Sequence, residues 1–246
     1  MKTTIILTSC ITPNAGAALL ADVAQRREQY VDALNWYLKN TPFDIVWTDN
    51  SNESIEDKIE PHYLKRIEFL TYQESSNGIQ NKGFKEWNIL KYVYENSQKV
   101  PKSDLLVKIT GRLKCLNVVH LASLIQKSNT NINNPLLYCT LNTKQTYVDT
   151  RIFFFNNYCF PYLLQIQPLM DDCYGTEEAF VSLVKKVHRI GGKMDIIPQP
   201  TQFLGVSGQF GNNYENDLKP LKYFIISVKH YYKKIVLWNA KRKKRI

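Results

Sequence analysis

The stretch Asp104-Leu-Leu-Val-Lys-Ile-Thr-Gly-Arg-Leu-Lys-Cys-Leu-Asn117 lies near the middle of the chain and predicts its fold. Its first half, Leu105 to Ile109, is a short apolar run of the kind found in strands buried on both faces of a parallel sheet. The run stops at Thr110-Gly111-Arg112. Apolar residues then recur at helical spacing from Val118 to Ile125, with Asn117 as the expected N-cap. The stretch therefore predicts a strand, a glycine turn and a helix.

Side chains at the end of this strand are candidates for ligand binding. In open α/β sheets, ligands bind at the carboxyl ends of the strands. We therefore expect Lys108, Thr110, Gly111 and Arg112 to contact a ligand. The alternative is that Gly111 only makes the turn and that Arg112 is solvated. The pattern alone does not separate the two, because strand-glycine-helix units are common in α/β proteins.

The composition is that of an ordinary globular protein. The chain has 246 residues, of which 44% are hydrophobic and 22% charged, and this length fits one large α/β domain or two small ones. The five cysteines are scattered singly, without metal-site spacing, which indicates reduced thiols and a cytosolic location. The first residues hold too short an apolar run for a signal peptide, and no apolar run is long enough to predict a transmembrane helix.

The positive charge is concentrated at the C-terminal end. The net charge is +10, and the segment from Lys219 onward contains ten Lys and Arg residues and no acidic residue, so the rest of the chain is balanced at 22 basic and 22 acidic residues. We therefore divide the chain into a folded domain, 1–218, and a basic tail, 219–246.

The tail has the pattern of an amphipathic helix that binds a membrane surface. Between Pro220 and Trp238 the apolar residues fall on one helical face and the lysines fall largely on the others. Each cation near an anionic bilayer contributes about 1 kcal/mol, so the cluster 241–245 strengthens this expectation. A nucleic-acid-binding tail is the alternative. We prefer the membrane, because the neutral body offers no groove-reading motif.

The N-terminal part predicts a β-α-β unit. Thr4 to Thr12 and Asp44 to Thr48 are expected strands, and Leu19 to Lys39 is the helix between them. Such a unit is right-handed and parallel, so both strands end at the same edge of the sheet. The polar side chains there are expected to contact a nucleotide: Thr8, Ser9, Asp49 and Asn50. Alternatively, they are only the polar ends of ordinary strands.

A third strand, Ile67 to Thr71, precedes a helix over 85–94. Lys82 and Gly83 open that helix with a cation, backbone amides and a flexible glycine, which suit a phosphate or a sugar. Glu86 is a candidate contact for the acceptor. It is equally explained as a carboxylate that stabilises the first turn of the helix.

The remaining elements complete an α/β pattern. Strands are expected over 136–140, 151–155 and 194–198, and a helix over 179–187 with Thr176 as its cap. Four carboxylates precede or open this helix: Asp171, Asp172, Glu177 and Glu178. The long Gly-rich loop from Gln199 to Tyr214 is expected to be either disordered or a lid.

The order of the short motifs resembles that of bacterial glycosyltransferases with the GT-A nucleotide-sugar-binding fold. The motifs are Asn81-Lys82-Gly83 with Glu86, Val107–Arg112, Asp149–Phe154, Tyr174–Glu178 and Gly205–Gly208. The resemblance covers about residues 3–215. It implies a single-domain, GT-A-like (Rossmann-like) α/β fold with a mixed, mostly parallel sheet flanked by helices. Added to this is the basic C-terminal helix.

The same resemblance implies a function. The enzyme would move a sugar from a nucleotide-sugar donor, with a UDP-sugar preferred, to a lipid-linked saccharide in lipopolysaccharide, O-antigen or capsule synthesis. It would act in the cytoplasm at the inner face of the cell membrane. No nucleic-acid partner is expected.

The resemblance also implies roles for individual residues. A carboxylate at the start of the helix after the acceptor-side strands would serve as base, which indicates Glu177, Glu178 or Asp172. The implied acceptor contacts are Glu86, Asp149, Arg151, Ser207 and Gly208.

One feature departs from the family. GT-A enzymes usually carry Asp-x-Asp after the central strand to hold a divalent ion. This chain has Thr110-Gly111-Arg112 there and no Asp-x-Asp elsewhere. Lys108 and Arg112 could stabilise the leaving diphosphate instead, so we expect a metal-independent enzyme. Asp171 and Asp172 keep Mg²⁺ or Mn²⁺ binding open.

Two other functions are alternatives to glycosyl transfer. A sugar nucleotidyltransferase should carry a Gly-rich signature directly after the first strand, and Cys10-Ile-Thr-Pro-Asn-Ala-Gly16 matches that signature poorly. A non-catalytic membrane or nucleic-acid adaptor would make the tail the functional part. We rank both below the glycosyltransferase.

Overall fold

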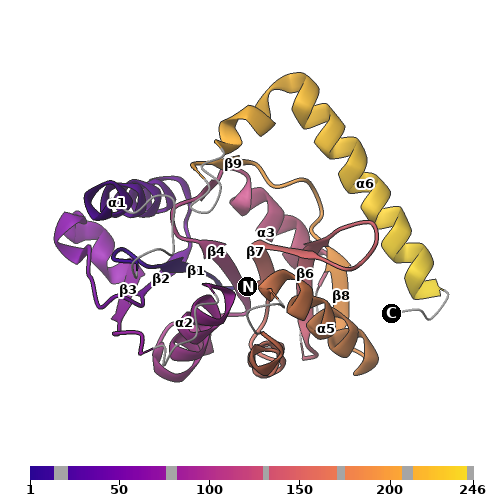
Figure 1. Cartoon of the computed structure of the whole chain (residues 1–246), viewed down its shortest axis with the longest axis horizontal. Coiled ribbons are helices and arrows are strands. Elements are labelled where there is room, and N and C mark those ends of the chain that lie inside the picture. The colour runs from indigo at the N-terminus through magenta and orange to yellow at the C-terminus, as the bar shows by residue number, and fades with distance from the viewer. Residues whose placement is uncertain (14–21, 76–81, 130–132, 171–174, 207–212, 243–246) are drawn as a thin grey trace.

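The computed structural model describes residues 1–13, 22–75, 82–129, 133–170, 175–206 and 213–242. A seven-stranded sheet forms the centre of the molecule (Figure 1). Its strands are β1 (Thr3–Ser9), β2 (Asp44–Asp49), β3 (Ile67–Thr71), β4 (Leu105–Thr110), β6 (Leu136–Leu141), β7 (Val148–Phe155) and β8 (Lys193–Ile196). A separate two-stranded sheet pairs β5 (Lys114–Cys115) with β9 (Phe203–Leu204).

The large sheet is mixed and mostly parallel, as predicted. Its spatial order is β3-β2-β1-β4-β7-β6-β8. Strand β7 is antiparallel to both of its neighbours, β4 and β6, whereas the other neighbouring pairs are parallel. The strand of the central stretch, β4, is the middle strand of the seven. The prediction of an interior strand at this position is therefore confirmed.

Helices cover both faces of this sheet (Figure 1). Helices α1 (Val23–Asn40) and α3 (Val118–Lys127) pack against one face, and α2 (Lys82–Asn96), α4 (Phe160–Leu164) and α5 (Thr176–Arg189) against the other. The last helix, α6 (Pro220–Arg242), runs along the outside of the molecule. Short 3₁₀ helices are η1 (Glu56–Lys58), η2 (Pro61–Arg66), η3 (Val100–Lys102), η4 (Gln167–Leu169) and η5 (Tyr214–Leu218).

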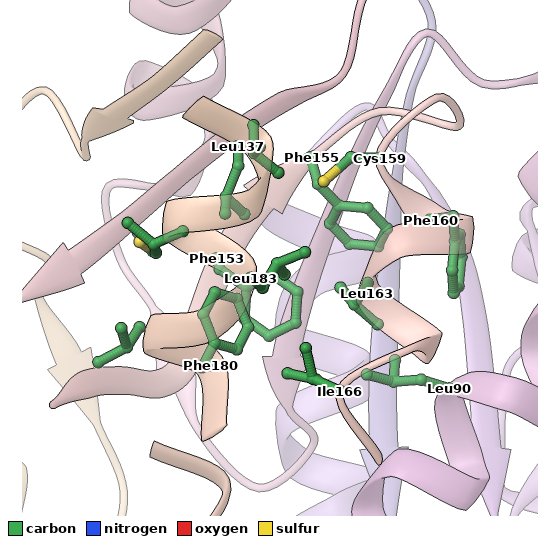
Figure 2. Close-up of a cluster of buried hydrophobic side chains, with 14 of the residues drawn as sticks. Leu90, Leu137, Phe153, Phe155, Cys159, Phe160, Leu163, Ile166, Phe180 and Leu183 are labelled. Atoms are coloured by element: carbon green, nitrogen blue, oxygen red, sulfur yellow. The ribbon is translucent and has the colours of Figure 1, made fainter. Parts of the chain in front are cut away.

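Aromatic packing dominates the core between the sheet and α5 (Figure 2). Phe153 of β7 lies with its ring centre 4.9 Å from that of Phe180 on α5, and Phe155 lies 5.0 Å from Phe160. Each of these side chains is fully buried, which contributes about 1.5–3 kcal/mol apiece. The apolar segment after β7 is therefore core, as its composition predicted.

The boundaries of β2, β3 and β4 agree closely with the predictions. Strand β1 ends at Ser9, three residues before the expected Thr12, and β7 begins at Val148, three residues before the expected start. Strand β3 spans the expected residues, and β2 and β4 each extend one residue beyond the expected end, to Asp49 and Thr110. The glycine after β4 is required by a close approach, because a Cβ on Gly111 would lie 2.7 Å from the carbonyl oxygen of Thr8. This approach holds the ends of β1 and β4 together.

Two predicted helix caps are corrected. Asn117 occupies the N-cap position of α3, but its side chain makes no capping bond. It instead donates to the carbonyl of Pro200 at 2.9 Å and accepts from the N–H of Gln202 at 3.1 Å. The N-cap of α5 is Gly175, and Thr176 is the first helical residue. For Asn117 the local pattern was misleading because its competing partners are distant in sequence, whereas the start of α5 is displaced by a single residue.

The loop expected over 199–214 contains ordered structure in its described residues. Phe203 and Leu204 form β9, which pairs with β5, and η5 begins at Tyr214. Residues 207–212 lie outside the description. The alternative of a fully disordered loop is therefore wrong for residues 199–206.

The predicted C-terminal helix is present as α6. Its buried residues include His230, whose Nε2 lies 2.8 Å from the carbonyl oxygen of Ile197, and Leu237, which joins the core. None of the described helices combines the length and apolarity needed to span a bilayer. The division into a 1–218 domain and a 219–246 tail stays a prediction.

Candidate functional site

The carboxyl ends of β1 and β4 meet where the connections of the sheet diverge. From β1 the chain passes through α1 to β2 on one side, whereas β4 lies on the other side of β1. Thr8 and Thr110, near the ends of the two strands, are partners in the register. In open α/β sheets, ligands bind at such a switch point. The candidate site is therefore built from the residues that surround these two strand ends.

Asp49 joins the loops that follow β1 and β2. Its fully buried carboxylate accepts hydrogen bonds at Oδ2 from Ser9 Oγ and from the N–H of Ile11, both at 2.9 Å. Oδ1 accepts from the N–H of Ser51 at 2.7 Å and from that of Glu53 at 3.3 Å. Asp49 and Ser9 therefore shape the site. Their direct contact with a donor stays a prediction, and it would have to compete with these bonds.

Helix α1 holds the loop after β1 with two side chains. Arg26 is only 5% exposed, and its Nε donates to the carbonyl of Cys10 at 2.9 Å and to that of Ile11 at 3.1 Å. The hydroxyl of Tyr30 accepts from the N–H of Cys10 at 3.0 Å. Burial raises the pKa of Tyr30, so the phenol stays neutral. The loop backbone is thus fixed from one side.

Three cations from different elements act electrostatically on Cys10. They are Arg26 of α1, Lys85 of α2 and Arg112 after β4. Burial and the charge of Asp49 raise the pKa of the Cys10 thiol, and these three cations oppose the rise. These three charges favour an anion at the carboxyl ends of β1 and β4, against the opposing charge of Asp49. This is the environment that a phosphate or diphosphate needs.

Arg112 and Asn50 have polar atoms left without protein partners. The Nε of Arg112 and the Oδ1 of Asn50 are buried and have no hydrogen-bond partner among the described residues. Within the described part of the chain, Arg112 makes a 3.5 Å bond to Gln29 and lies 5.9 Å from the ring centre of Tyr30. Buried polar groups are nearly always paired in folded proteins. These two atoms are therefore candidates for ligand contact.

A buried polar network lies on the α2 side of β4. The ammonium of Lys108, which is fully buried, lies 2.6 Å from Oε1 of Glu86. It donates to the carbonyl of Thr150 at 2.8 Å and to the hydroxyl of Thr110 at 3.4 Å. Thr8 donates to the same Glu86 oxygen at 2.9 Å. Three acceptors thus surround the three N–H groups of Lys108, and its predicted contact with a donor diphosphate would require them to separate.

Glu177 extends this network to α5. Its Oε1 accepts from the hydroxyl of Thr150 at 3.4 Å. Burial raises the pKa of Glu177 and the charges of Glu86 and Glu178 raise it further, while its own backbone N–H and Lys108 oppose the rise. A raised pKa makes this carboxylate a stronger base than an ordinary one.

Gly175 makes room for the two carboxylates that open α5. A Cβ at this position would lie 2.7 Å from Oε2 of Glu178 and 3.3 Å from Oε2 of Glu177. Both side chains therefore fold back over the first turn of the helix, where a carboxylate is stabilised by the backbone amides.

Neighbouring residues of β7 have different surroundings, because successive side chains of a strand point to opposite faces of the sheet. The pairing of β6 with β7 shifts register between Tyr138 and Thr140, as at a β-bulge. Thr150 bonds to Glu177, whereas the guanidinium of Arg151 lies 5.1 Å from the ring centre of Phe203. One strand therefore contributes to two different clusters.

Arg151 and Asp149 form a rigid ion pair. Nε and Nη2 of Arg151 donate to Oδ1 and Oδ2 of Asp149 at 2.9 and 2.6 Å, and the guanidinium also lies 4.6 Å from the ring centre of Tyr214. Burial alone would raise the pKa of Asp149, but the charge and hydrogen bonds of Arg151 hold it below its usual value. Both groups are therefore charged at neutral pH.

The predicted site residues are thus divided between surroundings. One linked group contains Thr8, Glu86, Lys108, Thr110 and Glu177. Arg112 lies on the other side of β4, toward α1, so it is not part of the Lys108 network. Gly83 lies in the first turn of α2, which begins at Lys82.

Some predicted residues cannot be placed. Asp172, Ser207 and Gly208, together with Asp171, lie outside the described residues, as does the side chain of Lys82. Within the described part of the chain, no group of three His, Cys, Asp or Glu residues is arranged to hold a metal ion. Cys10, Cys115 and Cys159 are free thiols.

Sequence reasoning gave no site role to Arg26, Tyr30, Lys85 or Thr150. Arg26 and Tyr30 are four residues apart on α1 and therefore share a helical face, which was the available signal. Lys85 precedes Glu86 in the first half of α2, and only the placement of α2 against the end of β1 brings it to Cys10. Thr150 acts mainly through its carbonyl, which no sequence pattern predicts.

Comparisons with known proteins give a weak likeness of fold. No protein-family model and no curated protein sequence matches this chain. A glycosyltransferase involved in glycosylation of the major capsid of PBCV-1 is 9% identical over 80% of this chain and 81% of its own, with a TM-score of 0.48. S. aureus TarS 1-349 in complex with UDP-GlcNAc is 11% identical over 96% and 70%, with a TM-score of 0.47.

A cytidylyltransferase from Leptospira borgpetersenii is 17% identical over 100% of this chain and 96% of its own, with a TM-score of 0.41. These neighbours are transferases, and they include both a glycosyltransferase and a nucleotidyltransferase. With TM-scores below 0.5, they assign no activity to this chain. The roles of its residues rest on the geometry described above.

Replacing Lys108 by Met tests the buried pair. It would leave the Glu86 carboxylate without its cation, and loss of one partner of a buried pair costs about 3–5 kcal/mol. We expect Lys108→Met to lower the free energy of unfolding in urea by about this amount, and Glu86→Gln added to it to recover part of the loss. The exposed pair of Lys58 and Asp57 is the control, because Lys58→Met should cost at most about 1 kcal/mol. Equal losses in both single variants would show that the Lys108 pair is solvated.

Proposed function

We propose that this protein is a glycosyltransferase that moves a sugar from a nucleotide-sugar donor to a lipid-linked saccharide acceptor. The preferred donor is a UDP-sugar. The observation that carries the proposal is the meeting of two chemically different groups at the ends of the central strands. A cationic cluster of Arg26, Lys85 and Arg112 lies around the loop after β1. A network ending in Glu177 lies between β4, β7 and α5.

The cationic cluster suits the diphosphate of the donor. Sugar transfer from a nucleoside diphosphate leaves negative charge on the departing phosphate, and fixed cations or hydrogen-bond donors stabilise that charge. Arg112 has a buried donor without a protein partner, and a planar guanidinium can bind phosphate oxygens in pairs. Asn50, with its unpaired Oδ1, is in place to meet a donor group of the nucleoside. A divalent ion bound by Asp171 or Asp172 is also compatible with this chemistry.

Glu177 is the proposed base. An inverting transfer needs a group that takes the proton from the acceptor hydroxyl, and a carboxylate with a raised pKa performs this better than an ordinary one. Lys108 and Glu86 act as positioning residues, because Lys108 binds the carbonyl of Thr150 and the hydroxyl of Thr150 binds Glu177. Glu178 is the alternative base on the same turn.

Helix α6 supports a membrane-bound acceptor. Its large apolar side chains on one face are 44–76% exposed: Leu221, Phe224, Ile225, Val228, Tyr231, Tyr232, Ile235 and Trp238. We call this set the apolar stripe. Contiguous exposed apolar surface marks an interaction site, and the stripe adjoins the basic segment 241–245, which complements an anionic bilayer. We therefore propose peripheral binding to the inner face of a bacterial cell membrane, in the synthesis of a surface polysaccharide.

The donor chemistry is tested with purified protein and a panel of UDP-, GDP- and CMP-sugars. We expect release of the nucleotide from one of them, and a loss of about 100- to 1,000-fold in turnover for Arg112→Ala, since one lost preorganised donor costs about 2.7–4 kcal/mol. Arg189→Ala, on the exposed end of α5, is the matched control. Unchanged turnover in Arg112→Ala would remove this residue from the site. Formation of a nucleotide sugar from a nucleoside triphosphate and a sugar phosphate would instead identify a nucleotidyltransferase.

Glu177→Gln should change activity and stability in opposite directions. Because the folded state raises the pKa of Glu177, it holds the proton more tightly than the unfolded chain does, and the contribution of this group to stability falls as pH rises above about 4.5. Removing the charge should therefore raise the thermal midpoint at pH 7 and leave it unchanged at lower pH. Turnover should fall by about 100- to 10,000-fold.

Glu178→Gln is the comparison for this experiment. The larger loss of turnover in Glu178→Gln would assign the base to Glu178. Full activity in both variants would exclude the first turn of α5 from the chemistry.

Binding to vesicles tests the apolar stripe. We expect the full-length protein to sediment with vesicles that contain phosphatidylglycerol, and Phe224→Gln/Trp238→Gln to sediment less, because two anchors of the apolar stripe become polar. Tyr158→Gln/Leu169→Gln is the matched control, since those side chains are similarly exposed, at 52% and 47%, on another surface. Equal loss in both double variants would show that general surface apolarity, and not the apolar stripe, carries binding.

A further inference from the structure

A pocket of about 220 Å³, lined by both charged and apolar side chains, lies between α6 and the body of the protein. The start of β7 contributes Asp149 and Arg151 to its lining, and α6 contributes Lys229, His230 and Lys233. The pocket is smaller than the roughly 300–1,000 Å³ of sites that enclose drug-sized ligands. It therefore suits a compact polar group.

The charges that line the pocket are unbalanced. Three cations, Arg151, Lys229 and Lys233, face two carboxylates, Asp149 and Asp217. Asp149 is bound by Arg151 through both oxygens, and Asp217 forms a 2.6 Å ion pair with Lys222, which does not line the pocket. The two lysines of the pocket therefore lack a matching negative charge within it. Such a concentration of cations attracts anions.

The electrostatics of the individual groups agree with this deficit. Burial lowers the pKa of Lys233, and the charges of Arg151 and Lys229 lower it further against the attraction of Asp149. Burial also lowers the pKa of His230 to about 4, so the imidazole is neutral at physiological pH and adds no charge. An anion bound between Lys229 and Lys233 would relieve the repulsion that Lys233 experiences.

The pocket lies close to the proposed base. Thr150, which bonds to Glu177, sits between the two pocket residues Asp149 and Arg151. Tyr147, just before β7, is affected by the charges of both regions. Burial and then Glu177 and Asp149 raise its pKa to about 12, while Arg151 opposes the rise. The lining of the pocket is therefore one residue along β7 from Thr150, the hydrogen-bond partner of Glu177.

We propose that this pocket binds the phosphate or pyrophosphate group of the acceptor, which is therefore a phosphate ester. The proposal rests on the proposed glycosyl transfer and identifies the class of its acceptor. Arg151 offers a rigid planar guanidinium held by Asp149, Phe203 and Tyr214, and the two lysines offer point charges from α6.

The position of the pocket favours a lipid as the source of the phosphate. The same helix carries the apolar stripe on its exposed face, so a phosphate in the pocket and a hydrocarbon chain in the bilayer lie on two sides of α6. A soluble phosphate ester would use the pocket without any contribution from the apolar stripe. The two sources are separated by probes with and without a hydrocarbon chain.

The test measures binding of inorganic pyrophosphate and of farnesyl pyrophosphate to the full-length protein by calorimetry. Ionic strength is kept constant, and saturating UDP is present to occupy the donor site. We expect Lys229→Gln/Lys233→Gln to weaken pyrophosphate binding about tenfold or more, because charge-assisted hydrogen bonds are lost. Lys219→Gln/Lys234→Gln is the matched control, since it removes the same charge from the same segment but outside the pocket.

The outcomes separate the pocket from general electrostatics. Equal weakening in both double variants, or no binding of pyrophosphate to the wild-type protein, would overturn the pocket. Tighter binding of farnesyl pyrophosphate than of inorganic pyrophosphate supports the lipid source. Equal affinity for the two would support the pocket and overturn that source.

Failure of the glycosyltransferase proposal has a different signature. Binding of UDP alone reports the donor site. A protein that binds pyrophosphate through Lys229 and Lys233 but neither binds UDP nor releases nucleotide from any donor would keep the anion pocket and lose the proposed transfer. Donor turnover with no effect of the lysines on pyrophosphate binding would keep the transfer and lose the pocket.

Discussion

The ion pair between Lys108 and Glu86 is the interaction on which the candidate site depends. A fully buried ammonium in the middle strand of the sheet is stable only with charge and hydrogen-bond partners around it. Those partners come from the end of β1, from α2, from β4 itself and from β7. The hydrogen bonds and the ion pair of this one ammonium therefore bring four elements into contact at the carboxyl edge of the sheet. The carboxylate of Glu177 is held at the end of this chain of bonds.

The sequence predicted the sheet well because its strands are short apolar runs between turn residues. The run before Gly111 was placed inside the sheet on that basis, and the structure confirms it. The two-residue strands β5 and β9 were not predicted, because two residues are too few to show an alternation of apolar and polar side chains. The cap at Asn117 was assigned from local preference, and contacts with residues distant in sequence decided otherwise. The N-cap of α5 differs from the predicted Thr176 by one residue.

The site was predictable in composition more than in arrangement. Lys108 was expected at a ligand because it stands near the end of a strand, yet its direction is set by the pleat, which turns it toward Glu86 and away from Arg112. Arg26 lies in the predicted first helix, where no sequence pattern indicated a site role. Only the fold brings it against Cys10. The order of residues indicates which side chains approach an edge of the sheet. Which of them bond to one another depends on the packing of helices from both faces.

The alternation of side chains along β7 has a consequence for how the molecule can respond to its substrates. Thr150 belongs to the carboxylate network, and its neighbours on either side belong to the pocket under α6. No separate hinge or linker lies between these two regions, because consecutive peptide units of one strand connect them. Any shift of the backbone there moves both regions. A ligand bound in one region would therefore affect the position of the residues in the other. Communication between substrate subsites would in this way be a property of local strand geometry, with no need for domain motion.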